Sequence, residues 1–338
     1  MHDAAAAVTI APPAPAASAL LVCPACRGPL TRVPSHAQCA ACGALYRGVD
    51  GSYDFADSGT ARPDERQHYE SKYETRRGGA TARYDTAAWA ERWNDPHWPE
   101  GQVILRRIGD CRGRVILALG NGASVKELFF AERGATLLHS DLSLSGPLTA
   151  KHAFDLGEGA ERVAFHAMDA YRLPLPDRSV DVVYGFEFVH HLPDVGAFFD
   201  EARRVLKPGG SCIFFDHGYS PLWQGLKMSI LRPVMKAAHW LHGISPEDRR
   251  ATYAGGYREA EMAALAAAHG VTGAWFERTT LFQYVLVNGV GKLLGWEQPM
   301  WCYRGAGRIG ASLDRLLTGR VAALKRSRVE MVWGFARA

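Results

Sequence analysis

The sequence predicts an α/β fold with a doubly wound, largely parallel sheet, preceded by a small cysteine-rich unit. From Arg114 to Asp216, apolar strand-like runs alternate with helix-like segments, which is the order that produces βαβ units. Two Cys-x-x-Cys pairs stand close together near the N-terminus. The chain has 338 residues, 47% of them hydrophobic, so it is long enough for one large domain and a smaller unit.

Composition excludes several classes of protein. Charged residues make up 22% of the chain and the net charge is +4, which argues against wholesale disorder and is too mild to predict a nucleic-acid partner. Basic residues cluster late, between Arg304 and Arg328. They form either a solvated helix face or a patch for an anionic substrate or a membrane surface. No apolar run is long enough for a spanning helix.

The N-terminal residues 1–20 are rich in Ala and Pro and lack a basic start. They predict a disordered tail rather than a signal peptide. The seven cysteines do not form a disulfide framework, and their spacing fits a reducing, cytoplasmic location.

Four of the cysteines have the spacing of a metal site. Cys23 and Cys26 form one pair, Cys39 and Cys42 the other, and twelve residues separate the pairs. Four thiolates can hold one Zn²⁺ tetrahedrally and leave no open coordination position. We therefore expect a structural Zn²⁺, which supplies much of the folding free energy of a unit this short.

The run from Cys42 to Phe55 resembles the end of a Trm112-like zinc ribbon. We expect the ribbon over residues 21–58 and a helical linker or lid over residues 59–104. Tyr69 and Tyr73 are four residues apart, as are Trp89 and Trp93, so each pair shares one helix face. These helices either pack on the next domain or cover a ligand, and the two roles are compatible.

The predicted large domain covers residues 105–338. The expected strands are 114–119, 135–141, 163–168, 180–184, 211–216, 271–281 and 329–336, and the expected helices are 124–132, 147–154, 195–206 and 259–269. In such sheets, ligands bind at the carboxyl ends of the parallel strands.

The first strand runs into a glycine turn. Gly120, Asn121 and Gly122 let the backbone approach a ligand. Asp141 ends the second strand about 20 residues later, where a carboxylate can accept both hydroxyls of a ribose. This pattern suits NAD and S-adenosylmethionine (SAM) alike. The sixth position of the turn is Val125, which leaves less room for a pyrophosphate.

Further motifs follow in order: Met168-Asp169-Ala170, Leu173-Pro-Leu-Pro-Asp177-Arg-Ser179-Val-Asp181, His190-His191-Leu-Pro-Asp194, and Arg204-Val-Leu-Lys-Pro-Gly-Gly210. Together with the glycine turn they resemble class I SAM-dependent methyltransferases of the small-molecule type. The resemblance covers residues 114–216. It implies a Rossmann-like, seven-stranded sheet with helical insertions, here following the zinc ribbon, and it implies SAM as cofactor.

The resemblance also implies roles for individual residues. Gly120, Asn121 and Gly122 would pass close to the methionine part of SAM, and Asp141 would hold the ribose. The remaining cofactor-binding candidates flank the adenine or border the methyl group, and they are Leu142, Asp169, Ala170 and Phe186.

One position departs from the family pattern. The family has an acidic residue two positions before the first glycine, and this chain has Ala118. That carboxylate orders the glycine loop and the methionine amine, so its loss would weaken SAM binding unless another side chain substitutes for it.

Methyl transfer requires alignment of acceptor and methyl, and for some acceptors a base. The candidate catalytic residues are Glu187, His190 and His191, which follow the fourth strand. Histidine titrates near neutrality and suits an O- or N-acceptor. Alternatively, His191 caps backbone groups at a helix start.

Two predicted insertions, at about 219–256 and 282–327, lie outside the basic fold and are apolar in part. Insertions there shape the acceptor pocket of such enzymes, so a hydrophobic or lipid-like small molecule is the expected acceptor, unless the insertions are ordinary helix packing. Peripheral membrane contact stays open.

Two other functions remain. An rRNA or tRNA base methyltransferase would use the zinc ribbon and the basic tail, although nucleic acid is the less favoured partner. A catalytically degenerate SAM-fold scaffold would explain Ala118. The sequence does not define the oligomeric state.

Overall fold

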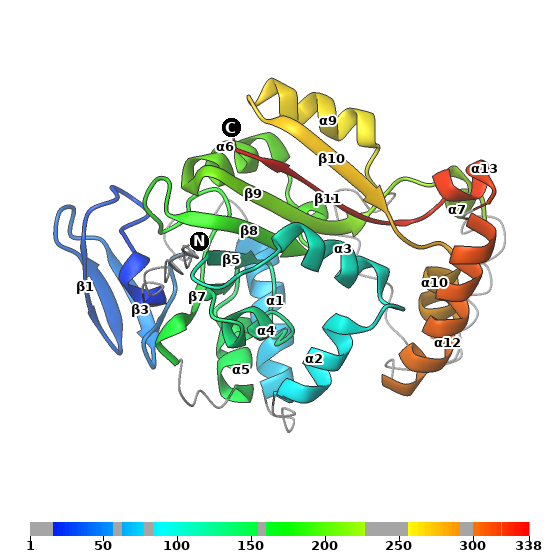
Figure 1. Ribbon diagram of the computed structural model, residues 1–338. Coiled ribbons are helices and arrows are strands. Elements are labelled where there is room, and N and C mark those ends of the chain that lie inside the picture. The colour runs from blue at the N-terminus through cyan, green and yellow to red at the C-terminus, as the bar shows by residue number, and fades with distance from the viewer. Residues whose placement is uncertain are drawn as a thin grey trace, which may run out of the picture.

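The computed structural model describes residues 16–56, 63–77, 84–154, 160–226, 256–290, 300–318 and 320–337. Its centre is a seven-stranded sheet in the order β10-β11-β9-β8-β5-β6-β7, with helices on both faces (Figure 1). The strands are β5 (Val115–Leu119), β6 (Thr136–Asp141), β7 (Val163–Ala167), β8 (Val180–Phe186), β9 (Leu206–His217), β10 (Thr272–Arg278) and β11 (Glu330–Ala336).

Five strands of the sheet run parallel, and the last strand reverses. β5 pairs in parallel with β6 and β8, β6 with β7, and β8 with β9. β11 is antiparallel to both β9 and β10. The carboxyl ends of β5, β6, β7 and β8 therefore meet at one edge, and this edge carries the candidate site.

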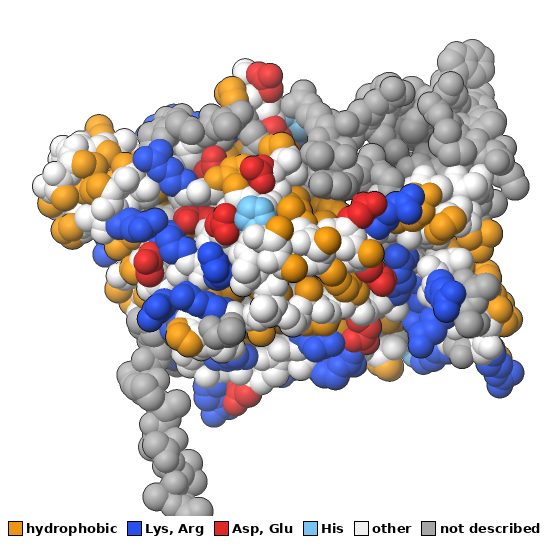
Figure 2. All heavy atoms as spheres, turned by 90° about the horizontal axis from the view of Figure 1, so that it is seen from above, with side chains coloured by type: hydrophobic (Ala, Val, Ile, Leu, Met, Phe, Trp, Pro, Cys, Tyr) orange, Lys and Arg blue, Asp and Glu red, His pale blue; other side chains and the backbone are white. Residues whose placement is uncertain are grey.

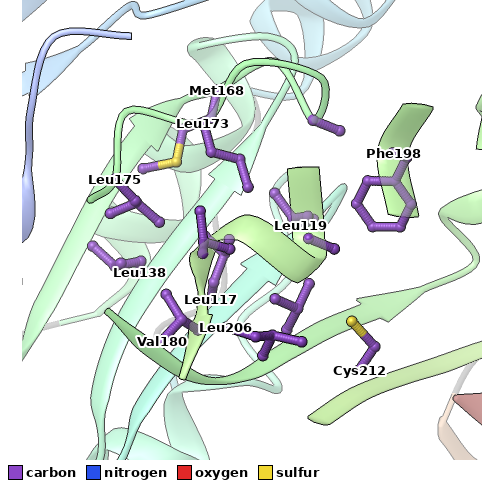
Figure 3. Packing of buried hydrophobic residues seen from close by; sticks show 14 of the residues in the cluster. Leu117, Leu119, Leu138, Met168, Leu173, Leu175, Val180, Phe198, Leu206 and Cys212 are labelled. Atoms are coloured by element: carbon purple, nitrogen blue, oxygen red, sulfur yellow. The ribbon is translucent and has the colours of Figure 1, made fainter. Parts of the chain in front are cut away.

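Alternation along the strands builds two cores. Val115, Leu117 and Leu119 of β5 join the core on one face of the sheet, whereas Ile116 and Ala118 join the core on the other. This is the two-residue period of a strand buried on both faces. Figure 3 shows the first core, where Leu117, Leu138 and Phe198 are gathered with Leu206 and Cys212.

The helices sort by face. α6 (Val195–Val205) and α9 (Glu259–Ala268) contribute to the first core, while α2 (Thr86–Asn94), α3 (Pro99–Ile108), α4 (Leu128–Glu132) and α5 (Ser145–Ala153) contribute to the second. α1 (Pro63–Arg77) lies next to α5 (Figure 1). The helices of the C-terminal insertion are α10 (Phe282–Tyr284), η5 (Val285–Val290), α12 (Met300–Leu313), η6 (Asp314–Thr318) and α13 (Ala322–Arg326).

A small four-stranded antiparallel sheet lies beside β7. It consists of β1 (Leu30–Val33), β2 (His36–Cys39), β3 (Leu45–Val49) and β4 (Ser52–Tyr53), after a short turn, η1 (Ala17–Leu20). After β4 the chain adds one parallel bridge to the large sheet, between Asp54 and Ala167. The backbone N–H of Phe55 donates to the carbonyl of Ala167 at 3.0 Å. The small sheet is thus attached to the edge strand of the large sheet through this bridge.

A buried histidine joins the two sheets. The backbone N–H of Tyr53 donates to Nδ1 of His166 at 2.9 Å, and the two rings stack at 5.4 Å. Burial, aided by the positive charges of Lys151 and Arg32, lowers the pKa of His166 to about 3. His166 is therefore neutral at physiological pH.

Most predicted elements are present, and several differ in their bounds. The helix expected at 124–132 begins only at Leu128, because the Ser124 carbonyl accepts from His139 Nε2 at 2.8 Å and Ser124 Oγ donates to Glu127 at 2.9 Å. The strand expected at 271–281 ends at Arg278. α3 begins with Pro99 at its first position, where proline is well tolerated, and it runs from the helical linker expected over residues 59–104 into the domain expected from residue 105.

Several predictions fall partly outside the described residues. They are most of the tail (residues 1–15), the linker at 57–62, most of the first insertion (227–255), and residues 291–299 of the second. α7 (Pro221–Leu226) is the described start of the first insertion. Among the described residues, no helix has the length and apolar character needed to cross a membrane.

Candidate functional site

A cavity of about 320 Å³ opens at the carboxyl edge of β5, β6, β7 and β8. This volume is in the range of small-molecule sites, roughly 300–1,000 Å³. Its wall combines residues from strand ends with residues from α1: Glu65, Tyr69, Lys72, Tyr73, Leu119, Gly120, Asn121, Lys126, Asp141, Leu142, Met168, Ala170, Phe186, Glu187, Phe188 and His191.

The glycine turn after β5 forms the floor of the cavity. Gly120 and Gly122 have φ values of +67° and +53°, which favour glycine. A Cβ on Gly120 would lie 2.4 Å from the Phe188 ring, and one on Gly122 would lie 2.0 Å from the Tyr73 hydroxyl. Between the two glycines, the side chain of Asn121 is 7% exposed, and neither its nitrogen nor its oxygen has a hydrogen-bond partner. A buried amide of this kind indicates a ligand site.

Asp141 ties the second strand to the glycine turn. Its carboxylate accepts from the backbone N–H of Gly122 at 2.8 Å and from that of Ser143 at 3.1 Å. Burial raises the pKa of Asp141 to about 6, although the backbone donors partly oppose this shift. A buried carboxylate at a strand end, facing a cavity, can accept hydrogen bonds from a diol.

The third strand supplies the next part of the wall. Met168 and Ala170 line the cavity together with Leu142, and they form an apolar side for a flat ring. Asp169, between them, is 7% exposed but does not line the cavity. Its Oδ1 accepts from the backbone N–H of Tyr171 at 3.0 Å.

The neighbourhood of Ala118 contains a different carboxylate. Ala118 lies in register with His139 on one side and Tyr184 on the other. Burial raises the pKa of Tyr184 well above its usual value, and the charge of the fully buried Glu127 raises it further. The same charge acts on the ring of His139. Glu127 therefore lies near the space that an acidic residue at position 118 would reach.

Glu127 is also linked to the cavity through Lys126. Lys126 Nζ lies 3.1 Å from the Glu127 carboxylate, 3.4 Å from Ser124 Oγ and 3.9 Å from the centre of the Phe186 ring. Lys126 and Phe186 both line the cavity. This arrangement puts a positive charge beside the glycine turn, and a buried carboxylate holds it there.

Helix α1 covers one side of the cavity. Glu70 accepts from the Ser145 hydroxyl at 2.5 Å, which fixes α1 to the start of α5. Tyr69 and Tyr73 stack at 6.1 Å and line the cavity, and the Tyr69 hydroxyl lies 3.4 Å from His191 Nε2. The tyrosine pair thus has contacts suited to both roles considered for the lid, packing and covering.

The three candidate catalytic residues follow β8. Glu187 has φ +53°, a rare conformation for a residue with a side chain, and its carboxylate lies 3.8 Å from His217 Nε2. Glu187 and His191 line the cavity, whereas His190 does not. The rings of His190 and His191 are 4.2 Å apart, so His190 lies directly behind the wall.

His190 has a buried partner that sequence reasoning did not identify. Its Nδ1 lies 2.5 Å from Oδ1 of Asp216, which is fully buried near the end of β9. Burial opposes protonation of the ring, but the hydrogen bond and charge of Asp216 outweigh it, so the pKa of His190 is raised. With Nδ1 bound to Asp216, Nε2 is the nitrogen left to exchange a proton.

The four cysteines meet at one end of the small sheet. Their sulfur atoms all lie within 4.8 Å of one another, with 3.7 Å between Cys23 and Cys42 and 3.4 Å between Cys26 and Cys39. Sulfur atoms about 3.8 Å apart are what a tetrahedral Zn–S distance of ~2.3 Å requires. Cys26 and Cys42 are exposed and the other two are buried. The donor set and its compactness fit a structural Zn²⁺.

Sequence reasoning missed part of the cavity wall. Glu65 and Lys72 of α1 were not proposed, nor were Lys126 and Phe188. The aromatic spacing around Tyr69 did signal a covering helix, but nothing in the sequence indicated which strand ends it would reach. These side chains come together through contacts between distant segments.

The strand order, with its antiparallel β11, and the cavity at the carboxyl edge define the Rossmann-like class I methyltransferase fold. Residues 116–214 match the family model described as a methyltransferase domain. The solved structure of geranyl diphosphate C-methyltransferase from Streptomyces coelicolor superposes with a TM-score of 0.50 and 10% identity, covering 83% of this chain and 99% of that one. Identity this low shows the fold alone.

Two curated relatives match parts of the chain. The 27-O-demethylrifamycin SV methyltransferase of Amycolatopsis mediterranei is 43% identical over 67 residues, which are 20% of this chain and 25% of that protein. The ubiquinone biosynthesis O-methyltransferase of Leptothrix cholodnii is 30% identical over 132 residues, 36% and 56% of the two chains. The chain spans between a quarter and about half the length of these relatives. The matches show that it carries a methyltransferase domain.

Proposed function

We propose that the protein transfers a methyl group from SAM to a small-molecule acceptor that is hydrophobic or lipid-like. The observation that carries this proposal is the cavity itself. The glycine turn, the unpartnered Asn121 amide and the Asp141 carboxylate converge there on one volume. Residues with these chemical properties are the ones that an adenosyl group and an amino-acid moiety require.

In this proposal the cofactor lies along the strand ends. Asp141 binds the ribose hydroxyls, and the apolar surface of Leu142, Met168 and Ala170 holds the adenine. Asp169 lies outside the cavity wall, so it is a weaker candidate for binding the adenine amine. Gly120 to Gly122 face the methionine part, with the Asn121 amide as a hydrogen-bonding group.

Lys126 and Glu127 can replace the acidic residue that the family has at the position of Ala118. Lys126 lies within reach of the methionine end of the cavity, and its ammonium would pair with the cofactor carboxylate. The buried Glu127 holds Lys126 and, through Ser124, the glycine turn. We infer that Glu127 takes over the loop-ordering role of the missing acidic residue, which favours an active enzyme over a degenerate scaffold.

SAM supplies an electrophilic methyl group when bound, so the chain has to align the acceptor and remove a proton. Tyr69 and Tyr73 on α1 cover the cavity and exclude water. His190, oriented by Asp216 and lying behind the cavity wall, would accept the proton through Nε2 by way of one bound water molecule as the acceptor oxygen or nitrogen is methylated. Glu187 and His191 border the same end and position the acceptor.

The acceptor class follows from the surroundings of this end. His217 faces Glu187 and also lies 3.5 Å from the hydroxyl of Tyr284 on α10. Trp223 of the first insertion contacts the Tyr284 ring at 5.1 Å. Apolar and aromatic side chains from both insertions thus approach the acceptor end. One of the curated relatives is named as an O-methyltransferase of ubiquinone biosynthesis and the other as a methyltransferase of 27-O-demethylrifamycin SV, which supports a small-molecule acceptor.

The binding test is isothermal titration of the intact protein with SAM. Asp141→Ala should weaken SAM binding by about 100-fold, since two charge-assisted hydrogen bonds to the ribose, worth roughly 1.5 kcal/mol each, are lost. Glu261→Ala, an exposed glutamate on α9, is the control and should leave the affinity unchanged. An unchanged affinity in Asp141→Ala, or no SAM binding by the native chain, would refute the site.

The four cysteines are proposed to bind one structural Zn²⁺. Cys26 is exposed and has little packing role, so Cys26→Ser should be nearly harmless unless a metal is bound there. We expect it to abolish zinc in metal analysis and to unfold the small sheet, measured by loss of amide protection at residues 30–53. Ala25→Ser, at the neighbouring exposed position, is the control. Full zinc content in Cys26→Ser would contradict this role.

A further inference from the structure

The C-terminal insertion presents a surface that methyl transfer does not explain. We call it the α12–α13 surface, and it lies at the end of the molecule opposite the small sheet (Figure 1). Figure 2 shows hydrophobic and basic side chains intermixed at the right-hand end of the molecule. The α12–α13 surface consists of nine exposed residues: Arg308, Ile309, Arg315, Leu316, Leu317, Arg320, Val321, Lys325 and Arg326.

Helical periodicity separates this surface from a packed inner face. Ile309 and Leu316 are seven residues apart and are 60% and 53% exposed, so they share the outer face of α12 and η6. On the inner face Ala311 is buried, and a Cβ on Gly310 would lie 2.4 Å from Cα of Gln283. The outer aliphatic side chains therefore lie on the exposed face of a helix whose other face packs against the rest of the protein.

The surface has no acidic side chain of its own. Between residues 300 and 328 the sequence contains one acid, Asp314. It is buried and accepts the backbone N–H groups of residues 281, 282 and 283 at 3.0–3.1 Å. Among the described residues, none of the ion pairs involves a cation of this surface. In the part of the chain that the structure describes, the cations of this surface therefore have no carboxylate paired with them.

The combination of charge and exposed aliphatic residues identifies the partner. Basic residues alone would suit RNA or a bilayer, because both carry phosphates. Recognition of single-stranded RNA relies on exposed aromatic side chains that stack on bases, and the residues of this surface are aliphatic or basic. Aliphatic side chains interspersed with Arg and Lys match the interface of an anionic bilayer, where each kind has a favourable environment.

We propose that the α12–α13 surface docks the protein onto an anionic lipid bilayer. The arginine and lysine side chains contact headgroup phosphates, and Ile309, Leu316, Leu317 and Val321 enter the boundary with the acyl chains. The inner face of α12 packs on α10, which carries Tyr284 beside His217. Where the proposed function also holds, docking brings the acceptor end of the cavity close to a lipid phase.

The test is flotation of the full chain with vesicles of phosphatidylcholine alone or mixed with phosphatidylglycerol. Binding should occur on the mixed vesicles only and should fall as salt increases. Arg308→Gln with Arg315→Gln should lower the partition coefficient by about fivefold per charge, from ~1 kcal/mol for each basic residue. Ile309→Ser with Leu316→Ser should lower it at least as much.

Matched controls separate docking from folding and from methyl transfer. Leu45 is equally exposed on the small sheet, so Leu45→Ser should leave vesicle binding unchanged. Thermal unfolding and SAM affinity should be unaffected in all of these variants, so the result does not depend on whether methyl transfer is correct. Absence of binding to mixed vesicles, unchanged binding in Ile309→Ser/Leu316→Ser, or binding of total RNA in preference to vesicles would overturn the proposal.

Discussion

The two halves of the cavity, the proposed cofactor half and the proposed acceptor half, are built in different ways. On the cofactor half, Gly120, Gly122 and Asp141 come from adjacent strands, and backbone hydrogen bonds fix them at the strand ends. On the acceptor half, Tyr69 of the wall comes from a helix before the domain, and the His190–Asp216 pair behind the wall comes from a turn after β8 and the end of β9. Under the proposed function, the cofactor half can vary little without losing SAM, while the acceptor half can be rebuilt by changing the segments around it.

The largest effect is expected from a substitution on the acceptor half, at Asp216, which should change kcat and leave SAM binding nearly intact. Asp216→Asn should lower kcat by about 100-fold, in the range of general-base contributions, while SAM affinity stays within about threefold. The Asp216 carboxylate raises the pKa of His190, so His190 is neutral only above that pKa. Removing the carboxylate lowers the pKa, and the acid limb of the pH–rate profile should move to lower pH.

Asp200→Asn is a matched control, because Asp200 pairs with His269 at 3.0 Å on the far side of α6. It should leave both kcat and the pH profile as in the native chain. A profile in Asp216→Asn that keeps its native acid limb would show that His190 is not the titrating group.

A smaller effect tests the cofactor half. Glu127→Gln and Lys126→Met should each weaken SAM binding by about tenfold, because the lysine is held by the buried carboxylate. If the pair acts as a unit, the double variant should bind SAM about as weakly as either single variant. Titration calorimetry measures all three, and fully additive losses would show that the two residues act separately.

How much the sequence could predict follows the same division. The glycine turn, Asp141 and the order of strands and helices follow from local patterns, since a strand end and the turn after it are set by neighbouring residues. The short α4 did not follow, because His139, on the adjacent strand, takes the Ser124 carbonyl. The sequence also did not indicate Asp216 and Glu127, because their roles depend on side chains that come close to them only in the folded chain.

The acceptor side illustrates the physical limit further. His190 and His191 could be proposed from their motif, but their distinct environments could not. The His190 ring is hydrogen-bonded to the buried Asp216, and the His191 ring lies next to the hydroxyl of Tyr69 on α1. Contacts between segments more than a hundred residues apart along the chain, as for Tyr69 and His191, leave no periodic signal in a single sequence.

The bridge between Asp54 and Ala167 has a consequence for solubility. β7 is the last strand of the large sheet, and its outer side would present unpaired N–H and C=O groups. Open strand edges recruit other chains and promote self-association. If the small sheet with its four cysteines unfolded, the outer edge of β7 would be exposed. By keeping the small sheet folded, the cysteines would therefore also protect the methyltransferase domain from aggregation.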